Sequence, residues 1–162
     1  MSTLFQSELM DIEPGWIDFN GHLNMAYYGV LFDRGADQVY PTLGFGPEYA
    51  AKRRLTTYTA EFHIRYIREL HLGDRVFTTF RLVDFDAKRF HALQELHHMD
   101  GWLAATGESM TLHVDMTGPR VTPMDADTLA RLEKMADAHA RVPLPPKTLS
   151  RAIAIPNSTR RP

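Results

Sequence analysis

The chain has 162 residues, a length that suits a single domain with its own hydrophobic core. Its formal net charge is -2, so neither sign of charge dominates, which argues against nucleic acid as the main ligand. It contains no cysteine, which excludes disulfides, zinc sites built on thiolates and a cysteine nucleophile.

The N-terminus and the distribution of apolar residues predict a soluble protein. The segment Met1–Asp11 lacks the basic start and the long apolar run of a secretory signal. No stretch approaches the roughly 18 uninterrupted apolar residues of a membrane-spanning helix. We therefore expect the protein to be cytoplasmic and to bind no membrane.

The first part of the chain predicts a long helix that follows a polar loop. An extended segment over about 5–17 leads into the loop at 18–24, which is rich in residues typical of caps and turns. Asn24 suits the N-cap position, and from Met25 to Tyr40 apolar residues recur at spacings of three and four. The residues expected to end this helix are Pro41 and Gly44.

After a basic connector at 52–54 the apolar pattern changes to a period of two, which predicts strands. On the first strand, Tyr58, Phe62 and Tyr66 should share one face and Glu61 should lie on the other. Most of the connections carry tight-turn signals, so we expect an antiparallel meander. The expected strands are Tyr58–Tyr66, Val76–Leu82, Phe90–His98 and Trp102–Met116.

A single long helix packed against a curved antiparallel sheet is an α+β arrangement. The pattern of apolar and polar residues over 125–139 predicts a further amphipathic helix on the surface. We expect one domain over 1–142, followed by a proline-rich and loosely held tail over 143–162.

The loop before the long helix carries the most specific pattern in the chain. Residues 16–28 read Trp-Ile-Asp-Phe-Asn-Gly-His-Leu-Asn-Met-Ala-Tyr-Tyr. This segment resembles the D-x-x-G-H-x-N-x-x-Y motif of hotdog-fold thioesterases of the 4-hydroxybenzoyl-CoA thioesterase type. The resemblance covers residues 16–116 and implies a hotdog fold, in which a curved antiparallel sheet wraps one long central helix.

Other segments resemble a narrower branch of that family. Residues 61–66, 84–89 and 112–116 are similar to the betainyl-CoA thioesterases of carnitine degradation. The resemblance implies an enzyme that hydrolyses a small acyl-CoA thioester, such as betainyl-CoA, to the free acid and CoA without a cofactor. It also implies a homodimer, or a dimer of dimers, with active sites at the subunit interface.

Thioester hydrolysis needs a carboxylate that attacks the carbonyl or activates water, and it needs donors for the developing oxyanion. The resemblance implies that Asp18 is this carboxylate, and its role as nucleophile or general base stays open. The N–H groups of Asn24 and Met25, at the expected helix start, are the candidate oxyanion donors. From spacing alone, Asp18 and Asn24 both fit capping or turn positions better than a role in the chemistry.

Three further polar residues are candidates for the site. His22 either orients the substrate or holds the loop. Many family members carry a second acid where this chain has Trp16, so Glu61 is an alternative base that would reach the partner subunit's Asp18. Glu61 equally fits an ion-paired strand surface. Glu108 lies among apolar positions of its strand, so we expect it to have a hydrogen-bonded partner.

If the substrate carries a trimethylammonium group, aromatic rings suit it because their faces attract cations. The candidate acyl-pocket residues are Trp16, Tyr28, Tyr58, Phe62 and Tyr66, and each of them also fits an ordinary core position. The candidate contacts for the phosphates of CoA are the basic pairs Lys88-Arg89 and Arg53-Arg54. The histidines lack ligand-like spacing, so we expect no metal site.

Two other functions are compatible with a hotdog fold. One is a hydratase or dehydratase acting on acyl thioesters, whose active-site loop the segment 18–22 does not resemble. The other is a non-catalytic acyl-CoA-binding protein, in which we would expect an attached DNA-binding segment. Only the thioesterase releases a free thiol, so a thiol-reactive dye distinguishes it from both.

Overall fold

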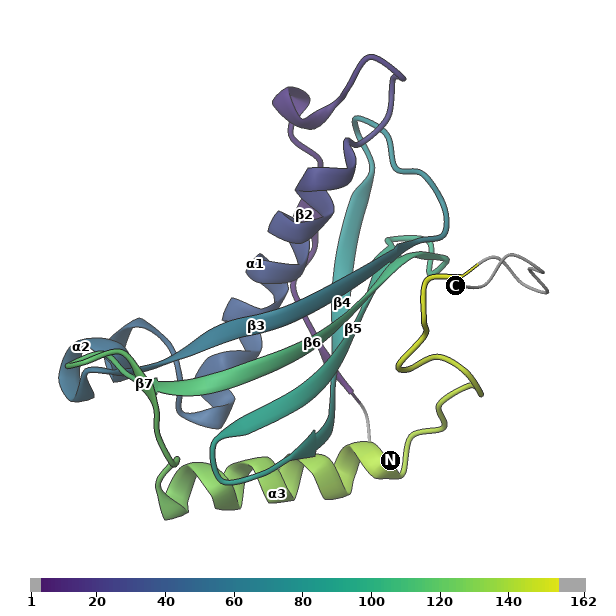
Figure 1. Cartoon of the computed structure of the whole chain (residues 1–162). Coiled ribbons are helices and arrows are strands. Elements are labelled where there is room, and N and C mark those ends of the chain that lie inside the picture. Colours follow the sequence, from purple (N-terminus) through teal and green to yellow (C-terminus); the bar gives the residue numbers. More distant parts are fainter. Residues whose placement is uncertain (1–3, 155–162) are drawn as a thin grey trace.

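The computed structural model describes residues 4–154, in which an antiparallel sheet is crossed on one face by a long helix (Figure 1). The strands are β1 (Phe5–Gln6), β2 (Met10–Asp11), β3 (Leu55–Tyr66), β4 (Arg75–Phe85), β5 (Arg89–His98), β6 (Leu103–Asp115) and β7 (Arg120–Val121). The helices are α1 (Met25–Leu43), α2 (Pro47–Arg53) and α3 (Ala126–Ala140), and a 3-10 turn, η1, spans Pro14–Trp16.

The long strands lie in the order β4–β5–β6–β3, with β1 and β2 paired to β4 and β7 paired to β6. All of these pairs are antiparallel, which confirms the expected strand direction. The expected meander holds for β4, β5 and β6, whereas β3 pairs with β6 and forms the far edge of the sheet. With α1 packed across one face, this is the α+β hotdog arrangement that the sequence predicted.

The helix α1 begins where the sequence predicts it and ends later. The Asn24 side-chain oxygen accepts the Ala26 N–H at 2.9 Å, so Asn24 is the N-cap. At the other end the helix continues to Leu43, with Pro41 inside its last turn, before Gly44 ends it at φ +86°. Leu43 is fully buried, so packing in the core retains this turn although Pro41 lacks a helical hydrogen bond.

Close contact with the sheet fixes the position of α1. A side chain at Gly35 would place its Cβ 2.0 Å from the Thr78 hydroxyl of β4, so only glycine allows this approach. Nearer the helix start, the Phe32 ring packs edge-on against the Phe62 ring of β3, with 5.6 Å between centroids. The helix therefore spans the sheet from β4 to the β3 edge.

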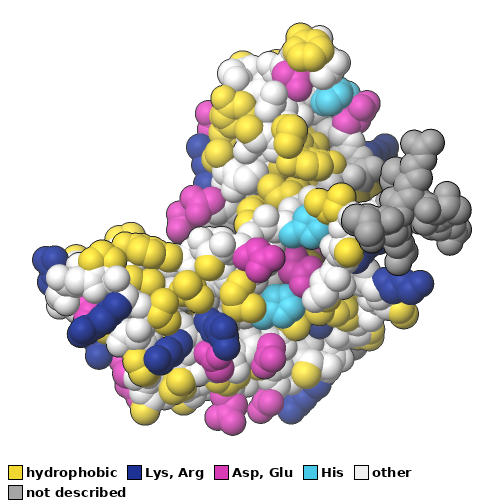
Figure 2. All heavy atoms as spheres, in the orientation of Figure 1, with side chains coloured by type: hydrophobic (Ala, Val, Ile, Leu, Met, Phe, Trp, Pro, Cys, Tyr) yellow, Lys and Arg dark blue, Asp and Glu magenta, His cyan; other side chains and the backbone are white. Residues whose placement is uncertain are grey.

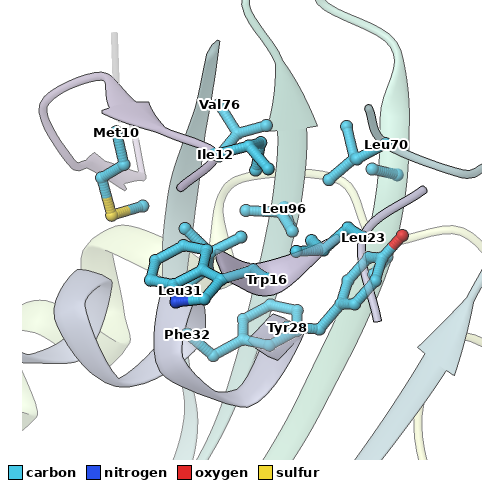
Figure 3. Packing of buried hydrophobic residues seen from close by; sticks show 12 residues of the cluster. Met10, Ile12, Trp16, Leu23, Tyr28, Leu31, Phe32, Leu70, Val76 and Leu96 are labelled. Atoms are coloured by element: carbon cyan, nitrogen blue, oxygen red, sulfur yellow. The ribbon is translucent and has the colours of Figure 1, made fainter. Parts of the chain in front are cut away.

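Buried side chains beneath the first turns of α1 hold the preceding loop in place (Figure 3). Leu23 is 2% exposed, and its N–H donates to the Leu70 carbonyl at 2.7 Å. Trp16 lies against the same cluster, which includes Leu31 of the helix and Leu96 of β5 (Figure 3). Replacing Leu23 by alanine would cost about 2–5 kcal/mol of stability, the usual range for a buried leucine. The loop at 18–24 is thus bound to the core on both sides.

The residues of β3 are distributed between its two faces differently from the prediction. The register between β3 and β6 shifts between Thr59 and Glu61, which marks a β-bulge. Because the bulge adds one residue, Tyr58 and Glu61 lie on the same face, the one turned away from α1, which we call the outer face. The prediction that Tyr58 shares a face with Phe62 and Tyr66 was wrong, since nothing in the alternating pattern marks a bulge.

The short elements were predicted in part. The helix α2 was not expected, and it contains Lys52 and Arg53 of the presumed connector. The expected amphipathic helix is α3, in which the Asp125 side chain accepts the Thr128 N–H at 2.8 Å as the N-cap. The stripe that α3 buries includes Leu132, and it packs against β4 and the end of α1.

The tail that follows α3 lies against the sheet as far as the structure describes it. The buried Arg81 guanidinium of β4 donates to the carbonyls of Val142 at 2.9 Å and Pro143 at 3.0 Å. Further along, the Ser150 N–H donates to the Glu108 carboxylate at 2.8 Å. None of the helices within residues 4–154 is long and apolar enough to cross a membrane.

Candidate active site

The loop before α1 is closed by hydrogen bonds within its own backbone. The Asp18 N–H donates to the His22 carbonyl at 3.1 Å, and the Gly21 N–H donates to the Asp18 carbonyl at 3.0 Å. Gly21 has φ +81°, which residues with a side chain rarely adopt. The glycine of the motif is therefore required by the backbone of the turn, and the space beside its Cα is open.

The half-buried Asp18 carboxylate is held beside the first turn of α1. One carboxylate oxygen accepts the Asn20 N–H at 2.8 Å, and the other lies 3.4 Å from the Asn24 side-chain nitrogen. The Asn24 side-chain oxygen is the one that caps α1 through the Ala26 N–H. A single amide thus links the carboxylate to the start of the helix, which is the juxtaposition that the sequence predicted.

Only one of the two expected oxyanion donors is free to bind a ligand within the described residues. The Asn24 N–H donates to the Trp16 carbonyl at 2.9 Å, so it is not available to a ligand, contrary to the prediction. The Met25 N–H makes no hydrogen bond within residues 4–154, as is usual for the first N–H groups of a helix. An isolated bridge between Ile17 and Leu23 causes the difference, because it brings the backbone of Trp16 onto Asn24.

His22 is turned toward other residues than Asp18. Its ring nitrogens lie 3.5 Å from the Leu23 carbonyl and 3.8 Å from the Glu69 carboxylate. The ring also packs edge-on against His71, with 6.4 Å between centroids. These contacts favour the interpretation that His22 holds the loop.

Two of the predicted acyl-pocket residues are core residues. Both faces of the Trp16 ring are covered, one by the Tyr27 ring at 5.4 Å and the other by the Arg34 guanidinium at 4.9 Å. Tyr28 is 3% exposed, and burial raises the pKa of its hydroxyl to about 12. Neither ring presents a face to a substrate cation.

The other predicted aromatic residues are partly exposed but do not lie together. The Tyr66 hydroxyl donates to the Met25 carbonyl at 3.1 Å, so Tyr66 lies at the helix start near Asp18. Phe62 faces α1 further along β3, while Tyr58 is on the outer face because of the bulge. The aromatic set expected from the sequence is therefore divided between three places.

A cavity of about 220 Å³ lies between α1 and the sheet and contains residues that sequence reasoning missed. Among them, α1 provides Asp33 and Tyr40, and β5 provides Gln94. Asp33 is exposed on α1, Tyr40 lies half-buried seven residues further along the helix, and Gln94 is buried at an inward position of its strand. The available signal was Gln94, a polar residue at an inward position of an alternating strand, whereas the exposed Asp33 fits an ordinary surface position of a helix.

A second cluster of polar side chains lies on the outer face, around a cavity of about 460 Å³ lined by Glu61, His63, His91 and Glu108 among others. Figure 2 shows acidic and histidine side chains side by side in the middle of this face. The Glu108 carboxylate lies 2.7 Å from the His91 ring nitrogen, which confirms the expected hydrogen-bonded partner. Glu61 is exposed and makes no hydrogen bond or ion pair within the described chain.

The basic pairs proposed for CoA differ in availability. Arg89 lies 2.6 Å from the Asp86 carboxylate, whose pKa is lowered first by the Lys88 N–H and then by Arg89. Arg53 is paired with Asp125. The side chains of Lys88 and Arg54 make no ion pair in the described part of the protein.

No group of three or more histidine, aspartate or glutamate side chains within residues 4–154 is arranged to hold a metal ion.

The sequence and the fold both match known proteins. A model of the thioesterase-like superfamily matches residues 12–132. A betainyl-CoA thioesterase of Pseudomonas aeruginosa is 32% identical over 161 residues, covering 96% of this chain and 98% of that protein. An L-carnitine dehydrogenase/betainyl-CoA thioesterase of Rhizobium meliloti is 33% identical over 135 residues, covering 83% of this chain and 27% of that longer protein.

Among solved structures, a hypothetical protein of Staphylococcus aureus in complex with CoA is similar with a TM-score of 0.87. Its sequence is 26% identical, and the match covers 96% of this chain and 98% of that one. The chain therefore belongs to the thioesterase-like superfamily and is a hotdog-fold thioester hydrolase.

Proposed function

We propose that this protein hydrolyses betainyl-CoA to betaine and CoA, with Asp18 as its catalytic carboxylate. The observation that carries the proposal is the link through Asn24, which holds the Asp18 carboxylate beside the start of α1. The relatives named as betainyl-CoA thioesterases support the choice of acyl group.

The chemistry follows from the donors and acceptors at the helix start. The thioester carbonyl oxygen accepts the free Met25 N–H, whose position at the positive end of the helix dipole stabilises the oxyanion. Asp18 either attacks the carbonyl carbon or takes a proton from the water that does. In either route the C–S bond breaks, and CoA leaves as the thiolate and takes up a proton. When Asp18 is the base, the water oxygen bonds directly to the acyl carbon and gives the acid; when Asp18 is the nucleophile, an acyl-Asp18 anhydride forms first, and water then hydrolyses it to the acid and the free carboxylate.

We further propose that two copies pair along the β3 edge. The strand β3 is long and forms a sheet edge, and it exposes Tyr58 by 49% and Tyr66 by 47%. An exposed apolar edge strand invites pairing with another strand, and a second copy of the chain offers the same edge. A dimer formed in this way, alone or paired into a tetramer, would place one subunit's β3 beside the other's helix start.

Two finer assignments belong to the same proposal. Lys88 and Arg54 are the better candidates for the phosphates of CoA, because Arg53 and Arg89 already have acidic partners. The enzyme would act in the cytoplasm, where acyl-CoA esters are available to it.

The Asp18→Asn variant tests the catalytic assignment. Asparagine keeps the size of the side chain and an oxygen for the Asn20 N–H, but it can neither attack nor accept a proton. We expect kcat for betainyl-CoA to fall by about 10²–10⁴-fold, the usual contribution of such a group. The release of CoA thiol is followed with a thiol-reactive dye, which also excludes a hydratase and a non-catalytic binding protein.

The matched control is Asp115→Asn. Asp115 accepts the N–H of Thr117, two residues on, at 2.9 Å, as Asp18 accepts that of Asn20. If Asp18→Asn loses no more activity than Asp115→Asn, Asp18 is only a turn residue. Glu61 then becomes the leading candidate for the catalytic carboxylate. A single turnover in ¹⁸O-labelled water then tests the nucleophilic role of Asp18. Label found in Asp18 and not in the acid requires an anhydride that water opens at the Asp18 carboxyl carbon, whereas a general base directs the labelled oxygen into the acid and leaves Asp18 unlabelled.

A further inference from the structure

Two acidic residues on α1 form no ion pair with a cationic side chain in the described part of the chain. Asp33 and Asp37 are one helical turn apart, and no ion pair to either is found within residues 4–154. The neighbouring Arg34 is engaged elsewhere, by Glu13 at 2.9 Å and by the Trp16 ring. Like charges at this spacing disfavour a helix. Burial, and then the Asp33 charge, raise the pKa of Asp37. The fold therefore presents negative charge that no side chain neutralises.

Aromatic residues line the same cavity as the exposed Asp33. The wall beside Asp33 includes Phe32, Tyr40 and Phe62. The Phe62 ring is 39% exposed, and the buried Phe32 ring packs edge-on against it at 82°. Aromatic faces combined with a carboxylate are the environment that binds quaternary ammonium groups in other proteins.

The cavity also contains a buried polar group without a partner in the described protein. Gln94 lines the same cavity, is 5% exposed, and its side-chain oxygen has no hydrogen-bond partner in the described protein. A buried acceptor without a partner is unfavourable. The N-methyl hydrogens of a quaternary ammonium group carry partial positive charge and would contact this oxygen favourably.

The cavity is also within reach of the helix start. Its α1 wall begins at Gly29, one turn beyond Met25, which is roughly 6 Å along the helix axis. Nothing lies within 4 Å of the position that a Cβ on Gly29 would take. The surface of α1 between Met25 and the cavity is therefore open to an acyl group at this residue. The side chain of Asp33 leans back along the helix toward its N-terminus. An acyl group whose carbonyl lies at the Met25 N–H can therefore extend toward Asp33.

We infer that this cavity is the subsite for a cationic acyl group and that Asp33 is its specificity-determining residue. The inference rests on the proposed function and gives it a structural cause: the enzyme would select betainyl-CoA by the positive charge of the acyl group rather than by its size.

The test compares two substrates that differ only in charge. Betainyl-CoA and 3,3-dimethylbutanoyl-CoA have the same shape, with nitrogen in one where the other has carbon. We expect wild type to prefer betainyl-CoA in kcat/KM, and Asp33→Asn to reduce that preference by about tenfold or more. Asp33→Glu should retain the preference, and Glu133→Gln, an exposed acid on α3, should not change it.

A second measurement needs no variant. Tetramethylammonium chloride should inhibit the wild-type enzyme competitively against the neutral substrate, at concentrations where sodium chloride does not. Should Asp33→Asn fail to fold, this inhibition decides the question alone.

The outcomes separate the inference from the proposed function. If wild type hydrolyses betainyl-CoA but Asp33→Asn has an unchanged preference, and tetramethylammonium does not inhibit, the subsite is refuted and the proposed function stands. If wild type prefers the neutral substrate, the inference and the choice of betainyl-CoA fail together. If wild type releases thiol from no acyl-CoA ester, the proposed function itself fails.

Discussion

At the scale of single residues, the Asn24 side chain has two roles: it caps α1, and it holds the Asp18 carboxylate. Its side-chain oxygen caps α1 and its side-chain nitrogen faces the Asp18 carboxylate. Aspartate is as good an N-cap as asparagine, but it would place a second negative charge where the nitrogen now lies. Asn24 is therefore a positioning residue whose two contacts can be tested independently.

We expect Asn24→Asp to retain the stability of the wild type while losing activity. The added charge should shift the acid limb of the pH–rate profile upward, because a neighbouring carboxylate favours protonation. Asn24→Ala should lose about 1 kcal/mol of unfolding free energy through the missing cap. Urea unfolding and kcat against pH measure the two effects. Equal pH profiles for wild type and Asn24→Asp would show that the nitrogen does not hold the carboxylate.

At the scale of elements, α3 is attached to the sheet through a titratable group. The His139 ring nitrogen accepts the Leu82 N–H of β4 at 2.9 Å, and His139 is 4% exposed. Burial, and then the Arg81 guanidinium, lower the pKa of His139. Protonation at this nitrogen would turn the acceptor into a second donor facing the Leu82 N–H. The contact therefore requires the neutral ring.

The stability of the protein should consequently fall in acid, with His139 as one cause. Above the unfolded pKa of about 6.5 the ring is neutral in both states and its contribution is complete. As the pH falls below that value the unfolded chain binds the proton more readily, and stability is lost toward the lower folded pKa. We expect His139→Gln to reduce the difference in unfolding free energy between pH 7.5 and pH 5.5.

The control for this prediction is His71→Gln, since the His71 side chain is 52% exposed. It should leave the pH dependence close to that of the wild type. A His139→Gln variant with the full pH dependence would show that other groups cause it.

At the scale of the whole molecule, the exposed β3 edge determines the proposed assembly. The opposite edge of the sheet, on β4, is paired with β1 and β2, so it is covered in part by the chain itself. The β3 edge has no partner strand beyond it in the described chain, and Ile67 just after it is 48% exposed. Natural proteins protect such an edge with charge or with a partner.

We expect wild type to sediment as a dimer or a larger even assembly at micromolar concentration. The double variant Tyr58→Lys/Ile67→Lys should shift it to the monomer, because lysines at an edge oppose strand pairing. Leu72→Lys/Met99→Lys makes the same change at exposed turn positions, at 55% and 50% exposure, and should have no effect. A monomeric wild type, or an edge variant that still associates, would contradict the proposed interface.

Local sequence determined the elements and the motif loop, because these depend on spacing and on side chains close in the chain. The helix start at Met25 follows from the cap at Asn24, and the turn of Asp18 follows from Gly21, the residue that accepts its positive φ. The alternating segments likewise predicted the long strands. The last turn of α1 was missed because burial of Leu43, not local preference, maintains it.

The tertiary structure alone decided which residues meet. The bulge in β3, formed in its pairing with the distant β6, moved Tyr58 to the outer face, and the bridge between Ile17 and Leu23 let the Trp16 carbonyl occupy the Asn24 N–H. Packing of α1 on the sheet brought Asp33 to the same cavity as Gln94, although 61 positions separate them in the chain (94 minus 33). Such contacts depend on how elements pack, and packing is not encoded in the spacing of any one segment.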